Sequence, residues 1–154
     1  SRQELADALT KEDRALLVRL FIANIEEIQE KLSVGKDKIL LLTEPLCALP
    51  VRERIFRDCI DLYGRKEGAE SVILIKPHPR DLLDYEKIFS GHIVLDRKFP
   101  MEVLNYIEGL TFSRVISVFT VVRNIRFAEE IIYLGEDFMD KYEDPRLHRQ
   151  NEEI

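Results

Sequence analysis

Three side chains that can carry positive charge lie close together in the sequence, at Lys76, His78 and Arg80. Pro77 and Pro79 alternate with them. Each proline lacks an amide donor and biases the residue before it toward an extended conformation, so Lys76 and His78 are held on a stiff segment. Cationic groups fixed in this way can bind an anion such as a phosphate. The alternative is a rigid connection whose basic side chains are simply solvated.

An apolar run leads into this stiff segment. Residues 72 to 75 are apolar without interruption, which predicts a buried parallel strand that ends in a turn. In open α/β sheets, ligands bind outside the carboxyl ends of the strands. Stiffness, position and charge therefore favour an anion site at Lys76, His78 and Arg80 over a solvated connection.

The rest of the chain alternates between apolar runs typical of strands and amphipathic segments typical of helices. Strands are predicted at residues 38–43, 72–75, 92–95, 114–119 and 130–134. Helices are predicted at residues 10–32, 50–63, 81–89 and 99–104, with a linker or short helix at 1–9 and a short helix after 135 that leads into a polar tail at 143–154. This alternation predicts a single domain over residues 1–154, an α/β fold with a Rossmann-like parallel sheet and helices on both faces.

Composition excludes several classes of protein. The chain has 154 residues, of which 45% are hydrophobic, enough for one domain with its own core. A formal net charge of -6 argues against nucleic acid as a partner. The sequence has no glycine-rich phosphate loop, which argues against mononucleotide kinases and dinucleotide dehydrogenases. Histidines and cysteines lack the spacing of metal ligands, so we expect no metal and no cofactor.

Cysteine use and hydropathy bear on the cellular location. Cys47 and Cys59 are too few for a disulfide framework, and no charged-then-apolar leader opens the chain, so we expect a cytoplasmic protein. No apolar run approaches the roughly twenty residues that cross a bilayer. Any membrane association would be peripheral, for example at the inner face of a bacterial inner membrane. Whether the chain forms a homodimer is left open.

Three segments resemble one family of enzymes. They read Leu-Leu-Thr-Glu-Pro-Leu at 41–46, Ile-Lys-Pro-His-Pro-Arg-Asp at 75–81 and Phe-Pro-Met-Glu-Val-Leu at 99–104. In order and spacing they are similar to the carboxyl-terminal half of the bacterial lipooligosaccharide sialyltransferases of glycosyltransferase family 52, over about residues 10 to 133. The resemblance implies one half of a GT-B fold, the half that binds the CMP part of CMP-sialic acid. The glycan acceptor would bind largely through an amino-terminal domain that is missing here.

The resemblance implies roles for individual residues. Negative charge develops on the departing phosphate and must be stabilised by positioned cations or hydrogen-bond donors. His78 would be the general acid, with Lys76 supplying charge and Arg80 as a second cation. Pro79 would fix the loop, beside the amino end of the helix expected from residue 81. Glu102 would accept hydrogen bonds from the ribose hydroxyls, although without the resemblance it could equally be a carboxylate that favours a helix dipole.

The third family element differs in this chain. In the family, a Ser-Ser or Ser-Thr pair after a late strand holds the phosphate. Here Phe119 replaces the first hydroxyl and Thr120 stands at the second position. Ser117 is a further candidate, although strand alternation could turn it away from the ligand. The resemblance therefore implies a phosphate contact from Thr120, with Ser117 as a second candidate.

The family's general base is also in question. Related sialyltransferases carry it in an acidic-acidic-glycine motif, which we expect after residues 43–46, but this chain has Cys-Ala-Leu-Pro at 47–50. Glu44 and Glu53 are the nearest carboxylates, and neither is a convincing replacement. The chain is therefore expected to be the CMP-sugar-binding domain of a sialyltransferase-like enzyme, inactive without its partner domain. The alternative is a nucleotide-binding or interaction module that keeps the fold but has lost transfer.

Overall fold

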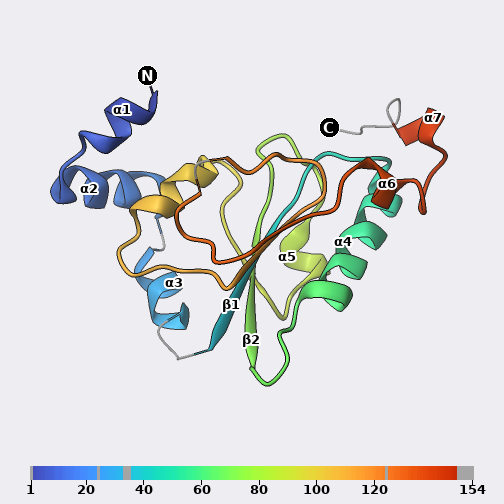
Figure 1. Ribbon diagram of the computed structural model, residues 1–154, viewed down its shortest axis with the longest axis horizontal. Helices are drawn as coiled ribbons and strands as arrows, with labels where there is room; N and C mark the ends of the chain where they lie inside the picture. The colour runs from blue at the N-terminus through green and yellow to red at the C-terminus, as the bar shows by residue number, and fades with distance from the viewer. Residues whose placement is uncertain (1, 24, 33–35, 124, 149–154) are drawn as a thin grey trace.

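The computed structural model describes residues 2–23, 25–32, 36–123 and 125–148. A five-stranded sheet lies at its centre, with the strand order β3-β2-β1-β4-β5 and every neighbouring pair parallel. Figure 1 shows two of these strands, β1 and β2, between the two groups of helices. The strands are β1 (Asp37–Leu42), β2 (Ser71–Lys76), β3 (Ile93–Val94), β4 (Arg114–Ser117) and β5 (Ile131–Tyr133). This topology confirms the predicted Rossmann-like α/β fold.

Helices cover both faces of the sheet (Figure 1). One face carries α2 (Lys11–Phe21), α3 (Ile25–Leu32) and the 3-10 helix η1 (Met101–Tyr106). The other carries α4 (Leu49–Tyr63), α5 (Tyr85–Ile88) and α6 (Glu136–Met139). The short helices α1 (Arg2–Asp7) and α7 (Pro145–His148) lie near the two ends of the chain.

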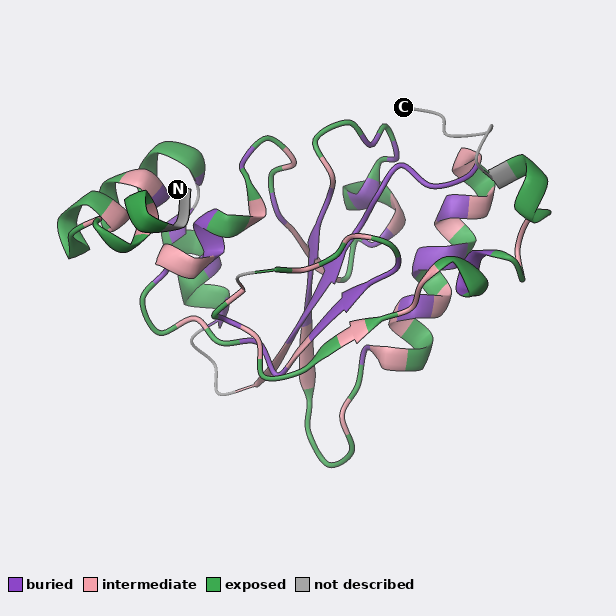
Figure 2. Ribbon diagram, turned by 45° about the horizontal axis from the view of Figure 1, so that its top comes forward, coloured by how far each residue is buried: buried purple, intermediate pink, exposed green. Residues whose placement is uncertain are grey.

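The central strand explains why the sheet is buried on both sides. Ile39 and Leu41 pack into the core beneath α4, whereas Leu40 and Leu42 point to the opposite core beneath α2 and α3. Each buried side chain of this size stabilises the fold by about 1.5 to 3 kcal/mol relative to exposure. Figure 2 shows buried residues concentrated in the central strands and exposed residues on the outer surfaces of the helices.

The predicted helix over residues 10–32 is wrong as a single element. α2 ends at Phe21, and Ile22 takes an extended backbone with φ −118° and ψ 90° before α3 begins at Ile25. The side chain of Ile22 is 1% exposed and belongs to the core. Tertiary packing of this side chain therefore overrides the helical periodicity of the sequence.

The helix predicted from residue 81 begins only at Tyr85. Asp81 is 0% exposed, and its carboxylate accepts a hydrogen bond from the backbone nitrogen of Leu83 at 3.1 Å, which holds the chain in a non-helical turn. No amino-terminal helix end therefore adjoins His78 at residue 81. The segment predicted as a helix at 99–104 is the 3-10 helix η1, and the polar tail predicted at 143–154 contains the short helix α7.

Strand ends also differ from prediction by one or two residues. β4 stops at Ser117, so Val118 and Phe119 belong to the following turn and not to the strand. β3 and β5 are shorter than predicted. Among the described residues, no helix combines the length and hydropathy that crossing a membrane requires.

Candidate functional site

The strand order changes direction between two neighbouring strands of the sheet, β1 and β4. β2 and β3 lie on one side of β1, whereas β4 and β5 lie on the other, so the chain changes direction between β1 and β4. Ligands of open parallel sheets bind at such a switch point. Glu44 follows β1 there, and residues 117–120, which we call the β4 turn, follow β4.

The β4 turn holds the carboxylate of Glu44. The Oε1 atom of Glu44 accepts hydrogen bonds from the backbone nitrogens of Phe119, at 3.1 Å, and Thr120, at 2.5 Å. The Ser117 Oγ atom lies 3.4 Å from the same oxygen and 2.7 Å from the Thr120 carbonyl oxygen. Because a hydroxyl carries one proton, the shorter contact takes it, and the two amides are the main donors to Glu44. Successive amides that converge on one oxygen form an anion-binding turn.

The structure places both predicted hydroxyl residues in this turn, but in different ways. Ser117 is 0% exposed and turns its hydroxyl toward the turn's own carbonyl group. Thr120 contributes its amide to Glu44, and so does Phe119, whose side chain has no hydroxyl. Side-chain patterns cannot reveal such a site, because every residue except proline has a backbone amide.

His78 lies at the carboxyl end of β2 in a tight turn. The Asp81 nitrogen donates to the His78 carbonyl at 3.0 Å, and the Arg80 nitrogen donates to the His78 Nδ1 atom at 3.1 Å. Since Nδ1 accepts a hydrogen bond, the proton of the neutral ring lies on Nε2. Partial burial and then the charge of Arg80 lower the pKa of His78, while the charges of Asp81 and Glu44 oppose this shift. The free protein therefore favours a neutral imidazole with an Nε2–H donor.

Lys76 is oriented toward the protein interior. Its Nζ atom donates to the carbonyl oxygens of Pro77, at 2.7 Å, and Arg97, at 3.2 Å, and lies 4.8 Å from the centre of the Phe99 ring. Burial lowers the pKa of Lys76 to about 8, and the charges of Asp96 and Glu102 act in the opposite direction. Lys76 thus fastens the start of the His78 turn and places a positive charge beneath it.

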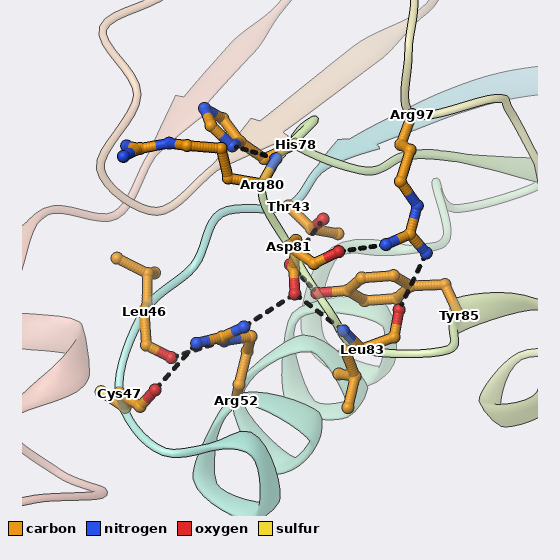
Figure 3. Close-up of polar contacts among 10 residues, drawn as sticks. All are labelled: Thr43, Leu46, Cys47, Arg52, His78, Arg80, Asp81, Leu83, Tyr85 and Arg97. Carbon is orange, nitrogen blue, oxygen red and sulfur yellow. Dashed lines mark hydrogen bonds and ion pairs between the residues drawn. The ribbon is translucent and has the colours of Figure 1, made fainter. Parts of the chain in front are cut away.

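The other predicted site residues lie on the surface at this edge. Pro79 and Arg80 are exposed, and Arg80 lies beside His78 (Figure 3). Glu102 is exposed in the first turn of η1 and acts electrostatically on Lys76, so the two residues are neighbours. Glu44 acts in the same way on His78. The carboxyl edge therefore brings Lys76, His78 and Glu102 to the same side of the sheet as the β4 turn.

Sequence reasoning missed a buried ion pair below the His78 turn. Arg52 and Asp81 are both 0% exposed, and the Nη1 and Oδ1 atoms that join them are 2.7 Å apart (Figure 3). The Arg52 guanidinium also donates to the carbonyl oxygens of Leu46, at 2.7 Å, and Cys47, at 2.9 Å. This contact holds the loop after β1. The signal in the sequence was the position of Arg52 on the apolar stripe of its helix, at helical spacing from the buried residues 55, 56 and 59.

Both oxygens of the Asp81 carboxylate accept hydrogen bonds. Its second oxygen accepts hydrogen bonds from the Tyr85 hydroxyl, at 2.6 Å, and from the Thr43 hydroxyl, at 3.3 Å. The Arg97 side chain donates to the backbone carbonyl of Asp81 and, at 3.3 Å, to that of Leu83 (Figure 3). We call Arg52, Asp81, Tyr85 and Thr43 the buried ion-pair cluster. It fixes the loops from which Glu44 and His78 project.

Neither cysteine is placed for reaction with solvent. Cys47 is 1% exposed with a left-handed backbone, φ 56°, and Cys59 is 0% exposed. Burial raises the pKa of the Cys59 thiol to about 12. In the part of the chain that the structure describes, no group of three or more His, Cys, Asp or Glu side chains is arranged to hold a metal ion.

Comparison with known proteins identifies a distant relative. An uncharacterized protein of Haemophilus influenzae (strain ATCC 51907 / DSM 11121 / KW20 / Rd) is 33% identical to this chain over 131 residues. The match includes 82% of this chain, which spans only about 40% of the length of the relative. No family model and no solved structure matches the chain.

Proposed function

We propose that this chain is the CMP-sugar-binding domain of a sialyltransferase-like glycosyltransferase that acts on bacterial surface glycans. One observation carries the proposal: at the topological switch point, two backbone amides converge on one carboxylate oxygen, at the same sheet edge as a histidine whose Nδ1 accepts a hydrogen bond and whose Nε2 is left to donate one. The family motifs at 41–46, 75–81 and 99–104 support CMP-sialic acid as the ligand. Such a domain would work in the cytoplasm, at the inner face of the membrane.

The chemistry follows from these donors. During transfer, an oxygen of an acceptor hydroxyl would bond to the sugar's anomeric carbon and give up its proton to a base. The bond between that carbon and a phosphate oxygen breaks, and its electron pair stays on the departing CMP. The amides of Phe119 and Thr120 would stabilise one phosphate oxygen, and the Nε2–H of His78 would donate to another. A neutral imidazole is too weak an acid to transfer its Nε2 proton, but the negative charge of a bound phosphate raises the pKa of the ring. The phosphate thereby favours the imidazolium form, which can give a proton to the departing phosphate.

The remaining residues would assist without touching the reacting bond. Glu102 is exposed in η1, where its carboxylate can accept hydrogen bonds from ribose hydroxyls. Lys76 contributes charge from below and holds the Pro77 carbonyl. Arg80 adds an exposed cation beside His78. The glycan acceptor would bind between this domain and a second one.

Ligand-dependent unfolding tests this proposal. Ligands that bind only the folded state raise the melting temperature. CMP and CDP should raise that of this chain, UMP and AMP should raise it much less, and the shift for CMP should shrink in the His78→Ala variant. Equal shifts for all four nucleotides, or none, would contradict a cytidine site. The isolated chain should not transfer sialic acid from CMP-sialic acid to lactose-type acceptors, and turnover would contradict the need for a second domain.

One observation favours a second candidate function. The general-base motif expected after residue 46 is absent, and the carboxylate of Glu44, which is 5% exposed, is bound to the β4 turn. A module that binds nucleotides but no longer transfers sugar would fit these facts. Cytidine binding by the chain, combined with inactivity of the full-length protein, would favour this candidate.

A further inference from the structure

We propose that the Glu44 carboxylate occupies the nucleotide's phosphate position in the free protein and must leave it when a nucleotide binds. This inference rests on the proposed function, which makes the β4 turn a phosphate site. Glu44 would then set the affinity of the site, as an anion that belongs to the chain and competes with the ligand.

The donors of the β4 turn carry the inference. The amides of Phe119 and Thr120, which lie 3.1 Å and 2.5 Å from Glu44 Oε1, are the groups that a phosphate oxygen would need. An N–H group makes one strong hydrogen bond, so the carboxylate and a phosphate cannot share these donors. The two anions would also repel each other at this distance in a partly buried site.

The turn is open enough for exchange. Phe119 is 44% exposed, and the hydrogen bonds from its amide and from that of Thr120 are only partly buried. The donors to Glu44 are neutral amides, whereas the carboxylate of Asp81 is paired with a guanidinium that is itself 0% exposed. An incoming phosphate would bring more negative charge to the same amides and add a contact from His78. Displacement of Glu44 is therefore balanced by gains elsewhere in the site.

A Glu44→Gln variant tests the competition. It keeps the size of the side chain and an acceptor oxygen but removes the charge, which weakens its hold on the amides. We expect it to bind CMP and inorganic phosphate about tenfold more tightly. This factor corresponds to a wild type in which Glu44 occupies the turn in about nine molecules of ten, so that only about one in ten is free to bind the ligand. Glu44→Ala should show the same direction, and Glu44→Gln decides the question if Glu44→Ala does not fold. Glu67→Gln is the matched control, since it removes one exposed carboxylate from the loop before β2.

Titrations with inorganic phosphate and CMP, followed through the backbone amide signals of Phe119 and Thr120 by NMR, separate the outcomes. Tighter CMP binding by Glu44→Gln, with shifts at both amides, supports the competition and the nucleotide site. Phosphate binding at these amides without CMP binding supports the competition but overturns the proposed function. CMP binding that is equal or weaker in Glu44→Gln overturns the competition and leaves the function standing. No binding of either ligand by any variant overturns both.

Discussion

Two buried carboxylates at the same edge of the sheet show how a polar group that maintains the fold differs from one that belongs to a site. Asp81 and its partner Arg52 are both 0% exposed, and the carboxylate and the guanidinium form an ion pair. Glu44 is 5% exposed, but it is bound by neutral amides of a turn whose Phe119 is 44% exposed. An anion matched by a buried cation needs no ligand. In the proposed exchange, an anion held only by partly buried amides occupies a place that another anion would take.

The largest effect that we expect is a loss of stability on replacing Asp81. Asp81→Ala leaves the Arg52 guanidinium in a fully buried place without its countercharge, so the free energy of unfolding should fall by about 3 to 5 kcal/mol. Urea denaturation measures the loss. Lys31→Ala is the control, because it breaks an exposed pair with Glu27 and should cost about 0.3 to 0.5 kcal/mol. Similar losses in both variants would contradict a structural role for the buried ion-pair cluster.

His78 should show the opposite pattern to Asp81. His78→Ala should weaken CMP binding by about 1.5 to 3 kcal/mol, the value of a charge-assisted hydrogen bond, with little change in the free energy of unfolding. Calorimetric titration at two pH values measures it. A bound phosphate raises the pKa of His78, so the affinity of the wild type should grow as the pH falls and that of the variant should not.

His92 provides a matched control for this measurement. It lies before β3, with its ring 6.2 Å from that of Phe89, and takes no part in the proposed site. His92→Ala should leave CMP affinity and its pH dependence unchanged. If His78→Ala instead lowers stability and leaves affinity alone, His78 belongs with Asp81 as a structural residue.

The sheet was predictable from the sequence because its strands are buried on both faces. The apolar runs at 38–43 and 72–75 correspond to β1 and β2 within one or two residues at each end. The end of α4 was predictable as well, because a glycine directly after an amphipathic segment is typical of a helix end, and α4 ends at Tyr63, just before Gly64. Local chemistry fixes both features, so no knowledge of distant contacts was needed.

The site was only partly predictable. The position of Lys76, His78 and Arg80 followed from where β2 ends, because a strand run and two prolines are local signals. The partners of Asp81 and Glu44 are not local: Arg52 is 29 residues from Asp81, and Thr120 is 76 residues from Glu44. The buried Asp81 carboxylate also explains why the helix predicted from residue 81 begins only at Tyr85. Contacts across such separations appear only when the chain is folded.

Lys76 lies between the buried ion-pair cluster and the proposed nucleotide site. Titration of its ammonium group tests to which of the two it belongs. Its ammonium group contacts Arg97, which binds the backbone of Asp81, yet it also lies beneath the His78 turn. NMR titration of the Lys76 Cε signal should give a pKa of about 8 in the free protein, because burial disfavours the charged form. Bound CMP should raise this pKa if the phosphate faces Lys76. Lys76→Met, which lacks the signal, provides the assignment, and a pKa that CMP leaves unchanged would place Lys76 with the buried ion-pair cluster.

The smallest expected effect is the pH dependence of stability near neutrality. Burial lowers the pKa of His78 and of His92 below the ordinary value of 6.5, with the Arg80 charge as a further cause for His78. As the pH falls through 6.5, the two histidines take up protons in the unfolded chain before they do so in the folded one. Their contribution to the free energy of unfolding is therefore present above pH 6.5 and is lost as the pH falls.

Denaturation of wild type, His78→Ala and His92→Ala between pH 7 and pH 5.5 tests this last point, since exposed carboxylates titrate mainly below that range. The free energy of unfolding should decline with falling pH in the wild type and decline less in each variant. The slope is the quantity to compare, because His92→Ala also removes the contact between its ring and that of Phe89 and so shifts the absolute stability. Saturating CMP should reverse the His78 contribution, since a bound phosphate raises its pKa, and should leave that of His92 unchanged. A slope that CMP does not alter would separate His78 from the phosphate and remove it from the site.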